Sequence, residues 1–548
     1  MPHCKIHNVR FYKPEPLAVR GMALQTSGKK LAVSRSNGTI EIWNLNNIWF
    51  IERTIAPTVD NFSVEGIAWS KNRLFSVGLH GLLIEYDLYK LTVKSRAAVT
   101  GESAFCLDIN KNKIAVGTEQ GTKSTSKKFL DKQEGRIICL KFDTTGEFVV
   151  TGSIDAIRVW SVESGHAIHK MTLGRSESNK PTIVWCLEVA NDFTVITGDS
   201  RGKLTVWDGK VGSQLESYQS HKADILALCL SDDHKSLYCA GVDPNIINYV
   251  KISVKEGSEK WVKSIQRKIH EHDVNALVVC DNKLYSGGMD GYLACSFHPP
   301  KTLLKVPPIL QNPCVQLAAE ARCLMLRYSK YVEVWSLGRS ENVEASFRGM
   351  LSLRDEPKKL LALQRVSKDY SGDEEQEGVN CSCMSDDGKW IMFSTCKGIR
   401  LFRFVYVDEK PNLLRVDDLE NKHIPCVQAV FTPNSSQLIL APNNGGLVIY
   451  DLKDDRASVN KILEITDIKD TITFLTTSSC GKYLIIEYDI KKRQYTEFSR
   501  HLEAHLPEQW KSRSYPIRNI TFDPRVDHII IFQDDSNIIV INKEKHIK

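Results

Sequence analysis

A strand–turn–strand pattern that recurs along the chain limits the possible folds more than any other sequence feature. Its clearest copy is LAVSRSNGTIEIWNL (residues 31–45), in which two apolar stretches flank a Ser-Asn-Gly-Thr turn. Asn-Gly between alternating apolar residues is the strongest short-range hairpin signal, because both residues tolerate positive φ. A single hairpin is marginally stable, so the copies must pack against one another. Further copies cover residues 74–88, 149–162, 194–208, 284–297 and 438–452.

The spacing of these copies predicts β-propeller blades. The closing aromatics Trp43 and Tyr86 lie 43 residues apart, and the turn glycines Gly38 and Gly81 keep the same step. A period of about 40–45 residues with several strands per repeat is typical of propellers. Each unit has two faces to cover, and radial stacking covers both while leaving only short edges. No apolar pattern of helical spacing runs through the chain, so we expect an all-β protein.

The number of units predicts two propellers in tandem. Seven units end near Pro299, so we expect a seven-bladed propeller over residues 1–315 and a second propeller over residues 316–548. The third unit lacks a strand, and in the eleventh Leu484 runs directly into Ile485, so the second propeller is predicted to be shortened or incomplete. It also carries an irregular acidic insertion over residues 354–379 that includes Ser371, whose context acidophilic kinases accept. The segment HNVRFY (residues 7–12) alternates like the strand that completes the last blade of closed rings.

The composition fits a folded chain without a membrane segment. Charged residues make up 25% and hydrophobic residues 42%, which argues against global disorder. A net charge of +6 permits a nucleic-acid partner without requiring one. The 15 cysteines include no C-x-x-C pair and mostly lie in apolar strands, as expected for free thiols in a reducing compartment. We find no signal peptide and no apolar stretch of membrane length, so we expect a soluble intracellular protein.

The units resemble WD40 repeats. Such repeats carry Gly-His near the first strand, an Asp in the tight turn and Trp-Asp at the close, but the only true Trp-Asp here is at residues 207–208. The fold prediction is therefore all-β, with two tandem WD40-type β-propellers. Since a carboxylate in the tight turn anchors the polar network of a WD40 blade, we expect these networks to be mostly absent. At the position of the turn Asp, four of the units carry Asn37, His80, Arg201 and Asn444.

Longer segments resemble the tandem WD40-propeller proteins of the small-subunit processome. The most specific strings are LAVSR-x-x-G-T near the N-terminus and YT-x-x-SR late in the chain, and the resemblance covers nearly the whole chain in order. The family has a complete third blade, a further blade between Leu484 and Ile485 and a tail past Lys548, so this chain is expected to be a shortened isoform or an incomplete gene model. The resemblance implies a non-enzymatic nucleolar scaffold of ribosome biogenesis, acting in early pre-rRNA processing toward 18S rRNA and linked to rDNA transcription. The implied partners are other propeller and helical-repeat subunits and pre-ribosomal RNA.

Basic and aromatic residues alternate between Lys491 and Arg518. Cations hold phosphates and aromatic rings stack on unpaired bases, so this mixture suits single-stranded RNA. The more common alternative is a solvated connection between blades, with the aromatic residues packed inward. Two arginines in tight turns, expected on the rim, suit either surface solvation or partner contact. The candidate RNA or partner contacts are Arg35, Arg201, Lys491, Lys492, Arg493, Arg500, Lys511 and Arg513.

We predict no catalytic, cofactor or metal site and no small-molecule substrate. His270 and His272 have no further ligands at fixed spacing, and a structural histidine before the first strand of unit seven is the more ordinary interpretation. Asp199, Asp243 and Asp290 recur at turns, where Asp commonly bonds to local backbone. The nucleophile-elbow and phosphate-loop motifs are missing. The alternatives to a processome scaffold are a WD40 adaptor, such as a substrate receptor of a ubiquitin ligase, and a propeller hydrolase.

Overall fold

The computed structural model describes residues 16–542, apart from a set of internal positions. The positions outside the description are 47–48, 58–61, 100–101, 125–134, 175–179, 254–258, 298–301, 309–313, 339–356, 369–373, 408–409, 418, 421, 444–445, 454–455, 464–471, 482–483, 485–487, 490–493, 496–507, 509–516 and 535. The described residues form 46 strands, all paired antiparallel or in short hairpins. Within this part of the chain, no helix has the length and hydropathy that crossing a bilayer requires.

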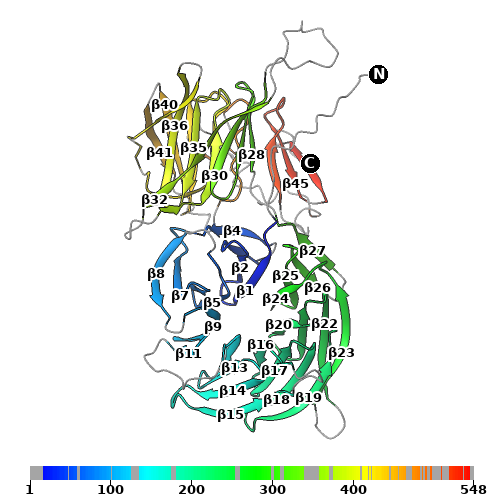
Figure 1. Ribbon diagram of the computed structural model, residues 1–548. Helices are drawn as coiled ribbons and strands as arrows, with labels where there is room; N and C mark the ends of the chain where they lie inside the picture. The colour runs from blue at the N-terminus through cyan, green and yellow to red at the C-terminus, as the bar shows by residue number, and fades with distance from the viewer. Residues whose placement is uncertain are drawn as a thin grey trace.

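Seven sheets, here called blades 1 to 7, form a ring in the first half of the chain (Figure 1). Each sheet follows chain order from its innermost to its outermost strand. Blade 1 holds β1 (Val19–Gln25), β2 (Lys30–Arg35), β3 (Ile40–Asn44) and β4 (Phe50–Ile55). Blade 2 holds β5 (Gly66–Ser70), β6 (Arg73–Val77), β7 (Leu82–Asp87) and β8 (Thr92–Ala98), and blade 3 holds β9 (Ala104–Asn110), β10 (Lys113–Thr118) and β11 (Gly121–Ser124). Blade 4 holds β12 (Cys139–Phe142), β13 (Phe148–Gly152), β14 (Ala156–Ser161) and β15 (Ala167–Thr172).

Blades 5 to 7 complete the ring. Blade 5 holds β16 (Val184–Val189), β17 (Thr194–Asp199), β18 (Lys203–Asp208) and β19 (Ser213–Gln219). Blade 6 holds β20 (Ile225–Leu230), β21 (Ser236–Gly241), β22 (Asn245–Ser253) and β23 (Glu259–Lys268). Blade 7 holds β24 (Val274–Cys280), β25 (Lys283–Gly288), β26 (Leu293–Phe297) and β27 (Thr302–Val306).

The ring is closed by contacts between innermost strands. Each innermost strand contacts that of the next blade, and β24 of blade 7 contacts β1 of blade 1. The hydrophobic core is divided in the same way, since each buried cluster is shared by two successive blades; one cluster joins Val19 and Trp43 of blade 1 to Leu293 of blade 7. All four strands of blade 7 come from one continuous segment, so this blade needs no strand from the N-terminus. The strand expected at residues 7–12 lies outside the described residues.

A second array follows with three adjacent four-stranded sheets, here blades 8 to 10. They comprise β28 (Val315–Ala318), β29 (Cys323–Arg327), β30 (Tyr331–Ser336) and β31 (Lys358–Gln364); β34 (Val379–Met384), β35 (Trp390–Thr395), β36 (Gly398–Val407) and β37 (Lys410–Arg415); and β38 (Cys426–Phe431), β39 (Gln437–Pro442), β40 (Leu447–Lys453) and β41 (Arg456–Leu463). A three-stranded sheet holds β44 (Asn519–Phe522), β45 (Ile529–Gln533) and β46 (Ile538–Asn542). Two short hairpins are β32 (Val366–Lys368) with β33 (Glu374–Gln376) and β42 (Tyr488–Asp489) with β43 (Gln494–Tyr495). The predicted fold class, tandem propellers with an irregular second array, is confirmed.

The template hairpin β2–β3 has a different turn from the predicted one. Gly38 has a φ of +83°, whereas Asn37 is not among the residues with positive φ. The Arg35 N–H donates to Thr39 O at 2.8 Å, and Gly38 N–H donates to Arg35 O at 2.9 Å. This is a three-residue loop that ends in a left-handed glycine, not a two-residue loop with two positive φ values. The Asn37 side chain instead accepts the Thr39 N–H at 3.0 Å.

Candidate interaction sites

Arg35, expected on the rim, is instead buried where the ring closes. Its side chain is 3% exposed, and Nε and Nη2 donate to the two carboxylate oxygens of Glu41, each at 2.9 Å. Nη1 donates to the main-chain oxygens of Leu17, at 3.1 Å, and of Gly291 in blade 7, at 2.6 Å. The expected rim position is wrong, because four hydrogen bonds hold the guanidinium between the first and last blades.

The other candidate contacts are distributed differently. Arg201 lies in the β17–β18 turn with its side chain 24% exposed, 3.6 Å from the Asp199 carboxylate. Because the Arg201 side chain is only partly exposed, its role in contacting RNA or a partner stays a prediction. The remaining six candidates lie outside the described residues: Lys491, Lys492, Arg493, Arg500, Lys511 and Arg513.

Blade 7 contains a buried His–Asp–Ser network. His270 Nδ1 lies 3.0 Å from both oxygens of Asp290, and Nε2 lies 2.8 Å from Ser286 Oγ. Burial raises the pKa of the Asp290 carboxyl, but the His270 hydrogen bond and charge and two backbone amides outweigh it and hold that pKa below its usual value. The connectivity is that of a catalytic triad, yet His270 and Ser286 are fully buried. The network therefore stabilises the interior of the blade.

Related polar contacts occur in the three preceding blades. His221 Nδ1 lies 3.2 Å from Asp243 in blade 6, and burial lowers the pKa of His221. In blades 4 and 5, the indole N–H of the closing tryptophan donates to a buried threonine, from Trp160 to Thr151 at 2.9 Å and from Trp207 to Thr197 at 3.0 Å. The expectation that carboxylate-anchored networks are mostly absent is therefore wrong for blades 6 and 7, whereas blades 4 and 5 have the Trp–Thr hydrogen bond alone.

A fixed spacing from the closing aromatic finds only one of the two His–Asp networks, because blade 7 has no aromatic at the equivalent position. Asp243 lies six residues before Tyr249, whereas the residue six positions after Asp290 is Ser296. In the sequence, these His–Asp networks can be recognised from a His before the first strand of a unit together with an Asp in its second turn. Within the described ranges, no group of three or more His, Cys, Asp or Glu side chains is arranged to hold a metal ion.

Three charged residues lie at one level of the innermost strands of blades 3 to 5. Lys141 Nζ on β12 lies 3.3 Å from Glu188 Oε1 on β16, and the Asp108 carboxylate on β9 accepts the Phe142 N–H at 2.8 Å. Burial raises the pKa of Asp108 and Glu188, whereas the charge of Glu188 raises that of Lys141. Each contact crosses from one blade to the next, so these charges join neighbouring blades near the ring centre.

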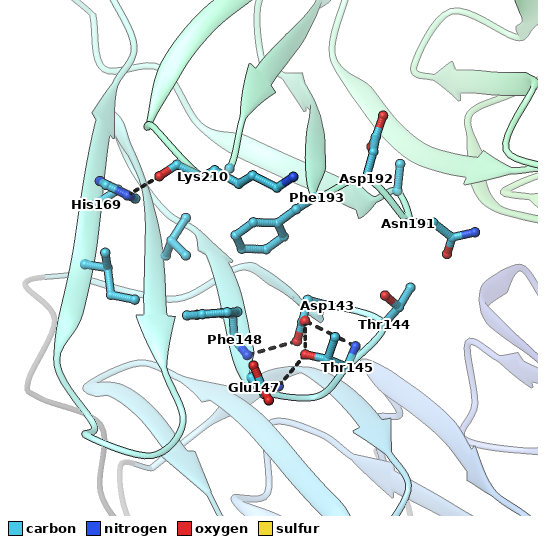
Figure 2. Close-up of a pocket in the computed structure, with 14 residues that line it drawn as sticks. Asp143, Thr144, Thr145, Glu147, Phe148, His169, Asn191, Asp192, Phe193 and Lys210 are labelled. Carbon is cyan, nitrogen blue, oxygen red and sulfur yellow. Dashed lines mark hydrogen bonds between the residues drawn. The ribbon is translucent and has the colours of Figure 1, made fainter.

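A pocket of about 390 Å³ lies between blades 4 and 5 (Figure 2). Phe148 and Phe193 form its apolar wall, with ring centroids 5.3 Å apart. The Asp143 carboxylate accepts the N–H groups of Gly146 and Phe148, each at 2.9 Å, so it shapes the loop. The rim carries charges of both signs, and the Thr145 hydroxyl donates to the Asp143 carboxylate, which also accepts the backbone N–H groups of its own loop. The pocket is therefore better suited to bind a side chain of a partner protein than to catalyse a reaction. The residues on its exposed rim include Thr144, Glu147, Asn191, Asp192 and Lys210.

The closed seven-sheet ring and its buried His–Asp contacts define a protein of the WD40 β-propeller class. The human protein named U3 small nucleolar RNA-associated protein 4 homolog is 26% identical to this chain, over 99% of this chain and 89% of its own length. The mouse protein of the same name matches equally, and U3 small nucleolar RNA-associated protein 4 of Schizosaccharomyces pombe is 28% identical over 90% of this chain and 74% of its own. Among solved structures, the WD40 β-propeller domain of Doa1 covers 52% of this chain and 94% of its own, with 14% identity and a TM-score of 0.43.

These comparisons correct one sequence-based attribution. Within the processome propeller proteins, the N-terminal and late segments quoted above suggest cirhin. The similar proteins from human, mouse and fission yeast instead carry the name U3 small nucleolar RNA-associated protein 4, with or without "homolog". No family model matches the chain.

Proposed function

We propose that this chain is a WD40 scaffold of ribosome biogenesis that associates with U3 small nucleolar RNA particles. The observation that carries the proposal is the similarity to U3-associated proteins along 99% of the chain, through both arrays. Propeller rims present several separate surfaces, which suits a subunit that contacts several partners at once. The place of action is then the nucleolus, and the step is early pre-rRNA processing toward 18S rRNA.

We also propose that the chain works without catalysis. The one Ser–His–Asp arrangement discussed above is buried inside blade 7, and in the pocket between blades 4 and 5 the carboxylate that accepts the Thr145 hydroxyl, Asp143, also accepts backbone N–H groups of its own loop. Its partners are then macromolecules: other propeller and helical-repeat subunits and pre-ribosomal RNA.

Co-purification tests this function. The tagged full chain is expected to sediment with large particles and to enrich U3 RNA over spliceosomal U1 RNA, whereas a tagged unrelated propeller is not. Depletion is expected to lower 18S rRNA while leaving 25S or 28S rRNA largely unchanged. If the chain recovers no U3 RNA and its depletion leaves 18S rRNA unaltered, the proposal is wrong; recovery of ubiquitin-ligase subunits instead would favour an adaptor.

The basic segment is proposed as the RNA-contacting part. Lys491, Lys492 and Arg493 combine positive charge with nearby aromatic residues in the sequence, and Arg201 is a partly exposed cation on the first ring. Reversing the three charges with K491E/K492E/R493E is expected to reduce ultraviolet cross-linking to pre-rRNA. The matched control is K260E/K263E/K268E on exposed positions of β23, which changes the net charge by the same amount. Equal cross-linking by both variants would remove the segment from consideration.

We propose that residues 1–315 and 316–548 are two folding units, because the first ring closes on itself. Contacts between innermost strands run from β1 around to β24 and back to β1, so this ring needs no strand from the second array. Limited proteolysis is expected to cut between Val306 and Val315 and to leave the first ring intact.

A further inference from the structure

In blades 1 and 2, the residue directly before the fourth strand closes the gap to the preceding blade. Trp49 precedes β4 and Leu91 precedes β8, and each side chain is buried, with 4% exposure. The ring centroids of Trp49 and of Tyr285 in blade 7 are 5.7 Å apart. Leu91 belongs to the buried cluster that blades 1 and 2 share. A side chain at this position therefore fills the junction with the blade before it.

Blade 5 has no side chain at the corresponding position. Gly212 directly precedes β19, and its N–H donates to Asp208 O at 2.8 Å, just as the Leu91 N–H donates to Asp87 O at 2.8 Å. The two turns therefore correspond residue by residue. The neighbouring Val211 does not replace the missing side chain, because it is 67% exposed. The junction between blades 4 and 5 is thus left unfilled, and the pocket of about 390 Å³ lies there.

The walls of this pocket suit an aromatic side chain. Phe148 and Phe193 line it and are partly buried, and Val159 and Ile168 add aliphatic surface. Aromatic rings bury a large apolar area and pack favourably on one another in tilted or edge-to-face arrangements. The volume is within the range of pockets that hold small ligands, so one inserted ring has room. At the junction of blades 7 and 1, an indole ring already packs against an aromatic residue in this way.

Two charged side chains determine which residues should flank that aromatic ring. Figure 2 shows Lys210 on one side of the two phenylalanine rings and Glu147 on the other. Both are exposed, and within the described residues neither the Lys210 ammonium nor the Glu147 carboxylate has a hydrogen bond or an ion pair. Asp192, another exposed acid at the rim, already pairs with Lys251 at 3.3 Å. A partner segment with a basic residue on one side of its aromatic residue and an acidic residue on the other complements both free charges.

We propose that the pocket between blades 4 and 5 binds an aromatic side chain of a partner protein, flanked by a basic residue that meets Glu147 and an acidic residue that meets Lys210. The bound ring lies against Phe148 and Phe193 and fills the junction as Trp49 does between blades 7 and 1. This inference goes beyond the proposed role in ribosome biogenesis and does not depend on it.

Selection of random displayed peptides on the purified full chain tests the predicted partner chemistry. The selected peptides are expected to share an aromatic residue with a basic residue on one side and an acidic residue on the other. Replacing the aromatic residue of a synthetic copy by alanine is expected to weaken binding about thirtyfold or more, as at interface hot spots, measured by fluorescence anisotropy. A selection that yields no binder, or binders without this pattern, overturns the proposal.

A charge exchange tests whether the selected peptide occupies this pocket. E147K/K210E is expected to weaken binding about tenfold, and a peptide with its basic and acidic residues exchanged is expected to regain affinity for this variant. Both positions are exposed, so the thermal unfolding midpoint should stay unchanged. The matched control K222E/E271K exchanges two exposed charges just before the first strands of blades 6 and 7, and should bind the original peptide as wild type does. Equal binding by E147K/K210E and wild type, or no rescue by the exchanged peptide, overturns the proposal.

Sedimentation velocity distinguishes a different partner protein from a second copy of this chain. The wild-type chain is expected to stay monomeric at the concentrations at which the peptide binds. Self-association that E147K/K210E abolishes would make a second copy the occupant and would overturn the proposal.

Discussion

At the residue scale, Arg35 joins the two ends of the first ring through hydrogen bonds. Its guanidinium is shared between Glu41, Leu17 O and Gly291 O, and the Trp43 indole N–H donates to the same Glu41 carboxylate at 3.0 Å. Removing one partner of a buried ion pair costs about 3–5 kcal/mol, since the other charge is left uncompensated. We expect R35A to lower the free energy of unfolding of the first ring by about this amount, as measured by chemical denaturation.

The partly exposed turn arginine is the control for that measurement. Arg201 lies 3.6 Å from the buried Asp199 carboxylate, which also accepts the backbone N–H groups of Arg201 and Lys203 at 2.8 and 2.9 Å. R201A leaves these hydrogen bonds in place, so it is expected to cost clearly less than R35A. Equal losses for R35A and R201A would contradict a special role of Arg35 in closure.

His221 makes the stability of blade 6 depend on pH. Burial lowers its pKa below the ordinary histidine value, although Asp243 acts in the opposite direction. The unfolded chain therefore binds a proton at a pH where the folded chain does not, and stability falls as pH drops below about 6.5. We expect wild type to lose more stability than H221Q between pH 7 and pH 5, measured by thermal unfolding at each pH. Parallel pH curves for the two proteins would show that His221 does not carry this dependence.

At the element scale, a thiol on the first strand repeatedly ties one blade to the next. Cys139 Sγ lies 3.5 Å from Val184 O, and Cys186 Sγ lies 3.4 Å from Ile225 O. The cross-strand partner of Cys139 is Gly152, and a Cβ on Gly152 would lie 2.5 Å from Cys139 Sγ and 2.8 Å from Val184 Cγ1. Glycine is needed there because the neighbouring blade approaches so closely.

A double-mutant cycle checks this packing. G152A is expected to destabilise the first ring by about 1–3 kcal/mol, the usual cost of overpacking a core. C139A/G152A is expected to recover part of that loss, because the shorter side chain makes room for the new methyl group. Strictly additive losses in chemical denaturation would mean that the Cys139 sulfur is not the group that the added methyl meets.

Burial also determines which thiols react. It raises the pKa of Cys139, Cys186 and Cys383 well above the usual thiol value, which keeps them protonated and unreactive. Cys480 is exposed. Among the described cysteines we expect Cys480 to be alkylated first by iodoacetamide in the native chain, as followed by mass spectrometry. Early modification of Cys139 or Cys186 would contradict the tight blade-to-blade packing.

At the scale of the whole molecule, the sequence pattern predicted the strands within each blade but not the contacts between residues far apart in the chain. Each blade is a run of hairpins with its own alternation, so the period of about 43 residues was enough to predict seven units. The burial of Arg35 depends on Gly291, 256 residues away, and no local pattern records that contact. The pocket between blades 4 and 5 likewise needs Phe148 and Phe193, which lie one repeat apart.

The closed first ring and the second array should differ in stability. The first ring has a continuous circle of contacts between innermost strands, whereas β46 leaves apolar residues exposed in the second array. Regions with fewer buried contacts open at lower free-energy cost, so proteases reach them first. We expect limited trypsin digestion to degrade residues 315–542 before a fragment of about residues 16–306, read by mass spectrometry over time. R35A should shorten the lifetime of that fragment, and R201A should not. Loss of both halves at one rate would mean that the two arrays unfold as a single unit.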